Sequence, residues 1–163
     1  MPLESDAELR SVFEHTSVIA VLGAKAQPGE DAWNVAHYLE RAGYTVRAVN
    51  PVIAHWGNAP VWPSLAALPE PADLTLVFRA PANLPAHVDE ILALSWRPDC
   101  VWFQLGIRHD ACAARLESAG IAVVQDRCAM TEHRRLASFV QRAQVSRSEP
   151  KASEDQQVGE RRP

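Results

Sequence analysis

The stretch VIAVLGAKAQPGEDAWNVAHYLERA, residues Val18 to Ala42, predicts a buried strand, a turn and an amphipathic helix. Its first five residues form a continuous apolar run, which is typical of a parallel strand covered on both faces. Gly23 ends that run, where the backbone must turn sharply or let another group come close. Asp31 suits the N-cap of the helix, whose apolar residues recur at helical spacing until Gly43 ends it.

The turn between this strand and this helix is a candidate anion site. Such a loop aims free backbone N–H groups and a helix N-terminus at one point, which suits phosphate. An ordinary strand–helix unit with an empty loop fits the same residues equally well. The stretch alone therefore leaves both interpretations open.

Composition narrows the class of protein. The chain has 163 residues, enough for one domain with a real core, and its net charge of −4 argues against general nucleic-acid binding. No apolar run approaches membrane-spanning length, and the acidic N-terminus lacks a signal-peptide pattern. The three cysteines, Cys100, Cys112 and Cys128, lack CxxC spacing and indicate reduced thiols in a cytoplasmic protein. The histidines show no metal-site spacing, so we expect no metal.

Strands and helices alternate along the rest of the chain. Strands are expected over Tyr44–Val49, Asp73–Phe78, Cys100–Phe103 and Ile121–Val124, with a very short one at Val61 and Trp62. Helices are expected over Glu4–His15, Leu84–Leu94, Asp110–Ala119 and Met130–Ala143, with one turn at Leu65 to Leu68. Residues Ile53 to Pro60 read as a loop that turns at Gly57 and Asn58. The alternation predicts an α/β fold: a doubly wound parallel sheet of about five strands in a three-layer α/β/α arrangement.

The composition changes near the C-terminus. Residues 1–143 form the predicted domain, whereas residues 144–163 are rich in Ser, Gln, Glu and Arg and nearly free of apolar side chains. We expect a disordered tail there, with a solvated helical extension as the alternative.

Ligands of doubly wound sheets lie beyond the carboxyl ends of the strands, so the residues after each strand form the candidate site. They are Gly23, Ala24 and Lys25; Asn50 and Pro51; Phe78 and Arg79; Gln104, Leu105 and Gly106; and Arg127 and Cys128. Glycines permit close approach, Lys and Arg suit phosphates, and Asn and Gln can read a base or an amide. No Ser-His-Asp or paired-carboxylate arrangement stands out. The set favours binding of a nucleotide-like anion over bond-breaking chemistry.

A dinucleotide such as NAD(P) fits these residues less well. The GxGxxG pattern needs two further glycines in the first turn, where Lys25 and Pro28 stand. The second strand ends at Asn50 and Pro51, without the acidic residue that binds the ribose of NAD. An NAD(P)-dependent oxidoreductase therefore stays a minor alternative, and a Walker-type phosphate loop is absent.

Several segments between Ser17 and Leu136 match, in order, the motifs of one known family. They are VIAVLGA, VAHYLERAGYTVRAVNP, VWPSL, DLTLVFRAP, VWFQLGIR and DRCAMTEHRRL. On these segments the chain resembles the small bacterial CoA-binding proteins, whose Rossmann-like domain is related to that of succinyl-CoA synthetase alpha subunits. The resemblance implies that CoA lies across the carboxyl edge of the sheet. It also implies a protein that binds CoA and has no assigned reaction.

The resemblance implies a role for each group of strand-end residues. These are Gly23, Ala24, Lys25 and Asn34 for the CoA phosphates, Asn50, Pro51, Phe78 and Arg79 for the adenosine end, Gln104, Leu105 and Gly106 as support for the same edge, and Cys128 near the pantetheine path. One departure matters: the family loop usually has Ser where this chain has Lys25, and a basic residue with Pro-Ser where it has Glu30, Asp31 and Ala32. A hydroxyl ligand is lost and two acids are added, so affinity for CoA could be reduced.

We therefore expect a protein that binds CoA or an acyl-CoA without catalysis, in a regulatory or carrier role. One alternative is a thiol-dependent or acyl-CoA-transforming enzyme that uses Cys128, although an inert buried thiol is the commoner case. Another is an interaction module with an empty cleft. Glu132 and His133 are adjacent on a helix, so their side chains diverge and capping or surface roles are expected. Trp33 and Trp56 read as packing residues, or as a cover for the site or a homodimer contact.

Overall fold

The computed structural model describes the backbone of residues 1–148 and the side chains of residues 1–138. Within this range a seven-stranded sheet has the order β3-β4-β2-β1-β5-β6-β7. The strands are β1 (Val18–Leu22), β2 (Thr45–Val49), β3 (His55–Trp56), β4 (Ala59–Trp62), β5 (Leu74–Val77), β6 (Cys100–Phe103) and β7 (Ala122–Val124). All neighbouring pairs are parallel except β3 with β4.

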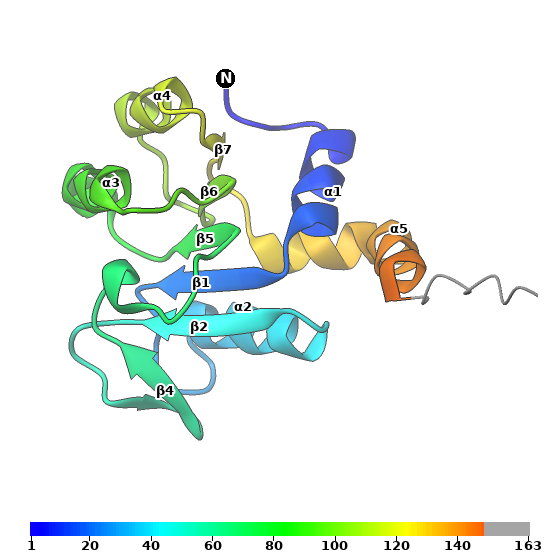
Figure 1. Ribbon diagram of the computed structural model, residues 1–163, viewed down its shortest axis with the longest axis horizontal. Coiled ribbons are helices and arrows are strands. Elements are labelled where there is room, and N and C mark those ends of the chain that lie inside the picture. Colours follow the sequence, from blue (N-terminus) through cyan, green and yellow to red (C-terminus); the bar gives the residue numbers. More distant parts are fainter. Residues whose placement is uncertain (149–163) are drawn as a thin grey trace, which may run out of the picture.

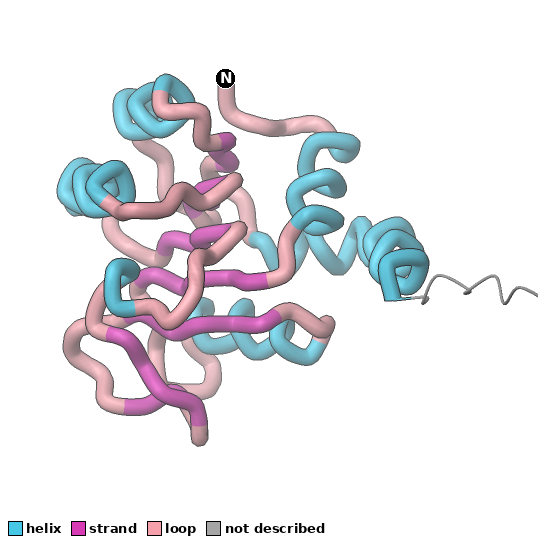
Figure 2. The backbone as a smooth tube through the Cα atoms, in the orientation of Figure 1, coloured by secondary structure: helices cyan, strands magenta, loops and turns pink. Residues whose placement is uncertain are grey.

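Helices cover both faces of the sheet, as the three-layer prediction requires (Figures 1 and 2). The helices are α1 (Asp6–His15), α2 (Asp31–Arg41), α3 (Leu84–Ala93), α4 (Asp110–Ser118) and α5 (Ala129–Ser148), with short 3-10 turns η1 (Leu65–Ala67) and η2 (Pro81–Asn83). One buried cluster joins α1, α2 and α5 to the sheet, and a second joins α3 and α4 to its other face. The Rossmann-like α/β fold is thereby confirmed.

The expected number of strands was too low. The very short strand expected at Val61 and Trp62 begins at Ala59 and forms β4. The expected loop before it contains β3, which pairs antiparallel with β4 around the predicted turn at Gly57, where φ is 59°. This hairpin forms because it carries Trp56, which is 2% exposed, into the core beside α2. A two-residue strand shows no periodicity from which it could be predicted.

Several helix boundaries differ from expectation, and two of the differences bear on the site or the tail. Glu30 occupies the N-cap of α2, without a side-chain cap, and Asp31 is the first helical residue. Helix α5 continues past Ala143 to Ser148, so a helical extension replaces the first part of the expected tail. Residues 149–163 lie outside the described range. Within that range no helix combines the length and apolarity needed to cross a membrane.

Candidate functional site

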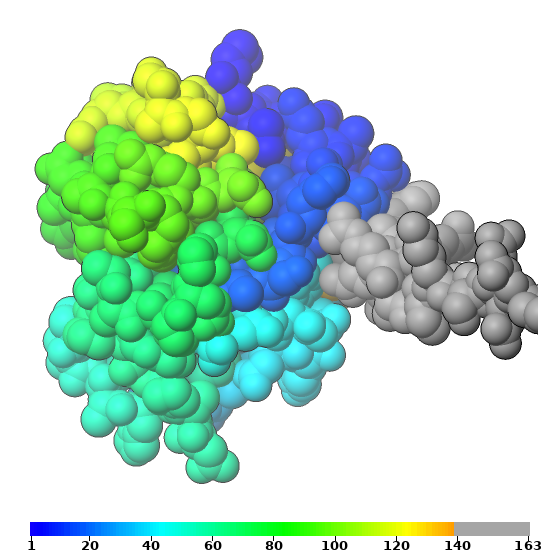
Figure 3. Space-filling model, in the orientation of Figure 1, coloured from blue at the N-terminus to red at the C-terminus, as the bar shows by residue number. Residues whose placement is uncertain are grey.

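The chain adds β2 and β4 on one side of β1 and then β5, β6 and β7 on the other, and this reversal of strand order determines where the site lies. β1 pairs with β2 on one side and with β5 on the other. The chain from β2 to β4 therefore occupies one end of the molecule and the part from α3 to α4 the other, as Figure 3 shows in cyan to green and in green to yellow. Doubly wound sheets bind their ligands at such a switch point, beyond the carboxyl ends of the strands. Gly23 follows β1 there, and Phe78 and Arg79 follow β5.

Gly23 allows these two strand ends to touch. Its φ is +88°, and a Cβ at this position would lie 2.4 Å from the carbonyl oxygen of Phe78 and 3.2 Å from Nε of Arg79. An L side chain has no room here and would also strain the backbone. The guanidinium side chain of Arg79 thus lies against the backbone of Gly23, next to the turn that the sequence indicated as an anion site.

A cavity of about 510 Å³ opens beside Arg79, a volume within the usual range for small-molecule sites. Its walls are the ends of β5 and β6 and the first turns of α2 and α5. It brings together five of the predicted site residues, namely Phe78, Arg79, Gln104, Leu105 and Cys128. We call it the carboxyl-edge cavity.

A second cavity, of about 400 Å³, adjoins the first. Lys25 lines it together with the segment from Gly29 to Ala32, and it shares Asp31 and Phe78 with the carboxyl-edge cavity. We call it the loop cavity. The acids noted as a departure from the family pattern therefore lie in the same hollow as Lys25.

Two buried donors at this site lack a partner among the described residues. The Gln104 side chain, 3% exposed, accepts a hydrogen bond from the Ala129 backbone N–H at 3.2 Å through Oε1. That bond fixes the amide orientation, because a backbone N–H can only donate. Nε2 of Gln104 and Nε of Arg79 remain buried without an acceptor. An unsatisfied buried donor costs about 1–3 kcal/mol, so this pair is the strongest local sign of a ligand that supplies acceptor oxygens.

Other predicted residues are committed to the loops themselves. The N–H groups of Gly23 and Ala24 both donate to the Val49 carbonyl, at 3.0 and 3.3 Å, and are therefore already satisfied. Asn50 donates from Nδ2 to the Ala24 carbonyl and accepts from the Val52 N–H, each at 2.8 Å. These bonds fasten the β1–α2 loop to the loop after β2. Asn50 accordingly holds these two loops in place at the carboxyl edge of the sheet. Neither Asn50 nor Pro51 lines the two cavities.

Asn34 and Gly106 also lie outside the walls of the two cavities. Asn34 is exposed on α2 and accepts a hydrogen bond from the Gly29 N–H at 3.3 Å. Gly106, exposed after β6, donates to Oδ1 of Asp126 at 2.7 Å. Both bonds shape the loops that border the site.

The expected capping or surface roles for Glu132 and His133 are wrong. His133 is 2% exposed, and its Nδ1 lies 2.9 Å from the Tyr38 hydroxyl. Burial lowers the pKa of this histidine. Glu132 is buried as well, because α5 packs against both α1 and α2. The spacing of Ala129, Glu132, His133 and Leu136, one inward stripe of a helix, was the available signal.

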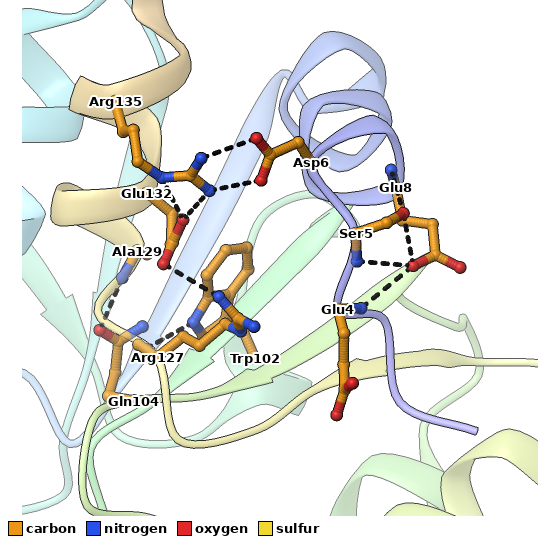
Figure 4. A network of polar contacts seen from close by, with 10 residues as sticks. All are labelled: Glu4, Ser5, Asp6, Glu8, Trp102, Gln104, Arg127, Ala129, Glu132 and Arg135. Atoms are coloured by element: carbon orange, nitrogen blue, oxygen red, sulfur yellow. Dashed lines mark hydrogen bonds and ion pairs between the residues drawn. The ribbon is translucent and has the colours of Figure 1, made fainter.

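A polar network fixes the chain around Cys128 (Figure 4). The Trp102 indole N–H donates to the backbone carbonyl of Arg127 at 2.7 Å, just before Cys128. The Arg127 side chain reaches Glu132 at 3.2 Å. Arg135 bridges Glu132, at 2.6 Å, and Asp6 of α1, at 2.7 Å. With the Ala129–Gln104 bond on the other side, the backbone is held both before and after Cys128.

The three cysteines differ in access. Cys100 and Cys112 are buried, and burial raises the pKa of Cys112 and raises that of Cys100 to about 12. Cys128 is partly exposed and lines the carboxyl-edge cavity. Within residues 1–148 no group of three or more His, Cys, Asp or Glu side chains is placed to hold a metal ion.

The family model described as a CoA binding domain matches residues 17–134, well over half of the chain. The chain belongs to this family. The resemblance derived from the sequence is thereby confirmed, and the matched span includes both cavities and every candidate site residue.

Two solved structures and one curated protein are similar to this chain over most of its length. The solved structure of cell-free ID.343 from Thermus thermophilus is 44% identical, with a TM-score of 0.77 over 82% of this chain and 99% of that one. A hypothetical protein from Pyrococcus horikoshii OT3 is 28% identical, with a TM-score of 0.77 over 84% and 96%. The uncharacterized protein YneT of Bacillus subtilis is 28% identical over 129 residues, which are 79% of this chain and 94% of the relative.

Proposed function

We propose that the protein binds coenzyme A, or an acyl-CoA, at the carboxyl edge of its sheet, in a regulatory or carrier role without catalysis. The observation that carries the proposal is the pair of unpartnered buried donors at the carboxyl edge, Nε of Arg79 after β5 and Nε2 of Gln104 after the neighbouring β6. CoA offers such donors both phosphate and amide carbonyl oxygens. Membership of the CoA-binding domain family supports this ligand over other anions.

The two adjoining cavities suggest how the ligand would lie. The phosphates would be near Lys25 and the first turn of α2, where a cation and a helix N-terminus favour negative charge. Arg79 would contact the middle of the molecule, and the pantetheine arm would follow the carboxyl-edge cavity toward Gln104 and Cys128. Glu30 and Asp31 would weaken binding by repulsion, since both line the loop cavity. The reduced cysteines support a cytoplasmic setting for this role.

Thermal unfolding with two cofactors tests the proposal. CoA should raise the melting temperature, because a ligand at about a hundredfold over its Kd adds roughly 2.7 kcal/mol to the free energy of unfolding. NAD is the matched control: it has an adenosine and a diphosphate but no pantetheine arm. Equal shifts with both cofactors, or a shift with NAD alone, would contradict the proposal.

A further inference from the structure

We propose that Cys128 forms a mixed disulfide with coenzyme A by thiol–disulfide exchange with CoA disulfide. The inference rests on the proposed function and deepens it, because it assigns the thiol end of the ligand to one residue of this chain. It would make the protein a stoichiometric acceptor of oxidised CoA.

Access separates Cys128 from the other two cysteines, all of which lie in the described part of the chain. Cys100 and Cys112 are 3% and 2% exposed, whereas Cys128 is partly exposed. Cys128 also lies where two cavities meet. It lines the carboxyl-edge cavity and a neighbouring one of about 350 Å³, which share Leu105, Cys128 and Thr131. A disulfide that is longer than one cavity therefore has room on both sides of this thiol.

The unpartnered Nε2 of Gln104 is a separate sign of a ligand beside Cys128. Gln104 accepts its hydrogen bond from Ala129, the residue that directly follows Cys128, and lines the same cavity. Its buried Nε2 needs an acceptor. In the pantetheine arm only two methylene carbons separate the thiol sulfur from the nearest amide nitrogen, so the carbonyl of that amide lies close to the sulfur. A hydrogen bond from Gln104 to that carbonyl would bring the ligand's sulfur to Cys128.

Cys128 is held by hydrogen bonds of its own backbone and of the residues on either side of it. Its backbone carbonyl accepts from the Glu132 N–H at 3.0 Å, so Cys128 stands at the N-terminus of the 20-residue helix α5. The bonds of Trp102 to Arg127 and of Ala129 to Gln104 hold the backbone on both sides of Cys128, next to the carboxyl-edge cavity.

The exchange is balanced without any further oxidant. The Cys128 thiolate attacks one sulfur of CoA disulfide, and a bond forms between Sγ and that sulfur. The sulfur–sulfur bond of CoA disulfide breaks at the same time, and the second CoA leaves as a thiolate that takes a proton from water. The cysteine is oxidised, one CoA is released in reduced form, and a free thiol can reverse the reaction.

Intact mass spectrometry of the full chain tests the inference. The protein is incubated with CoA disulfide or with glutathione disulfide, a matched disulfide that lacks the nucleotide. Wild type and Cys112→Ser should gain one CoA, and Cys128→Ser should gain none. The reaction with CoA disulfide should be at least about tenfold faster than with glutathione disulfide, because binding positions the reacting sulfur. Peptide mapping of the wild-type adduct should find the CoA on Cys128, which avoids reliance on the variant's folding.

Each contrary outcome has a distinct meaning. An adduct that persists in Cys128→Ser would overturn the inference. Equal rates with both disulfides would also overturn it, because they would show that Cys128 reacts as an ordinary exposed thiol. Calorimetry of wild type with reduced CoA separates the two proposals. Binding of CoA without an adduct would overturn this inference alone, whereas absence of binding together with absence of an adduct would overturn the proposed function as well.

Discussion

At the scale of single residues, the site depends on two contacts, Gly23 with Arg79 and Gln104 with Ala129. Each joins segments that are far apart in sequence. The sequence indicated Gly23 as a turn and Arg79 as a ligand residue, but not that one lies against the other. Such a contact follows from the pairing of β1 with β5, which periodicity alone does not specify. The sequence could not indicate the unpartnered Nε2 of Gln104 either, because the orientation of this amide depends on the hydrogen bond that its Oε1 accepts from Ala129.

Arg79→Ala should weaken CoA binding while the fold stays intact. The guanidinium lines the carboxyl-edge cavity, and a charged hydrogen bond to phosphate contributes about 1.5–3 kcal/mol. That corresponds to a loss of roughly tenfold or more in affinity by calorimetry. Arg115→Ala is the matched control, since Arg115 pairs with Asp89 on the surface outside both cavities and should leave the affinity unchanged. Unchanged affinity in Arg79→Ala would place this residue outside the site.

Gly23→Ala should destabilise the protein far more than Gly29→Ala. Both glycines have positive φ, +88° and +95°, so each alanine pays a backbone cost of about 1–2 kcal/mol. Only at Gly23 would the new methyl meet a backbone atom, the Phe78 carbonyl oxygen at 2.4 Å, whereas nothing lies within 4 Å at Gly29. Urea unfolding of the two variants measures the difference. Equal losses would show that β1 and β5 can move apart at no cost.

At the scale of elements, segments with a strong hydrophobic pattern were predictable from the sequence. Features that depend on contacts between distant segments were not. The apolar run of β1 and the spacing of α2 were identified with their correct extents, apart from the N-cap. Hairpin β3–β4 was missed because its stability comes from burying Trp56 against α2, which local sequence does not reveal. Helix α5 was found, but its contacts with both α1 and α2 bury the polar pair Glu132 and His133, which the adjacency argument had placed on the surface.

This packing of α5 predicts a loss of stability at low pH. Burial lowers the pKa of His133, so the folded protein binds fewer protons than the unfolded chain as pH falls toward and below about 6.5. The stability that comes from the neutral histidine is therefore fully present above that pH. As pH falls below it, the free energy of unfolding decreases by at most about 1.4 kcal/mol per pH unit for one histidine. Burial lowers the pKa of His37 too and adds a dependence of the same sign.

Urea unfolding over a pH series checks this dependence in wild type and in His133→Gln. Glutamine can keep a hydrogen bond to the Tyr38 hydroxyl but does not titrate. The variant should therefore lose part of the pH dependence and retain the part due to His37. His15→Gln, at the exposed end of α1, is the control and should follow wild type. A slope that is the same in His133→Gln as in wild type would show that His133 does not titrate on unfolding.

At the scale of the whole molecule, the sheet has two edges with different properties. A cavity of about 640 Å³, larger than either candidate cavity, lies at the amino edge, between α1 and the starts of β5, β6 and β7. Its polar wall is already satisfied where Asp73 accepts from the Ser17 and Val18 N–H groups, at 2.8 and 2.9 Å. The carboxyl edge instead has the unpartnered donors and the switch point. Cavity volume therefore favours the amino edge, whereas the unpartnered donors of Arg79 and Gln104 favour the carboxyl edge. Buried donors that need an acceptor are the more specific sign of a ligand.

Hydrogen exchange with and without CoA distinguishes these two edges. Protection should increase at the carboxyl edge, in the β1–α2 loop, after β5 and β6, and in the first turn of α5, because these segments form the walls of the two candidate cavities. Helix α1 and the residues that precede β5 and β6 should exchange as before, since they line only the cavity at the opposite edge. Protection confined to α1 would place the ligand in the larger, apolar cavity. The same experiment in Arg79→Ala should then show no loss of protection, because that side chain would have no part in binding.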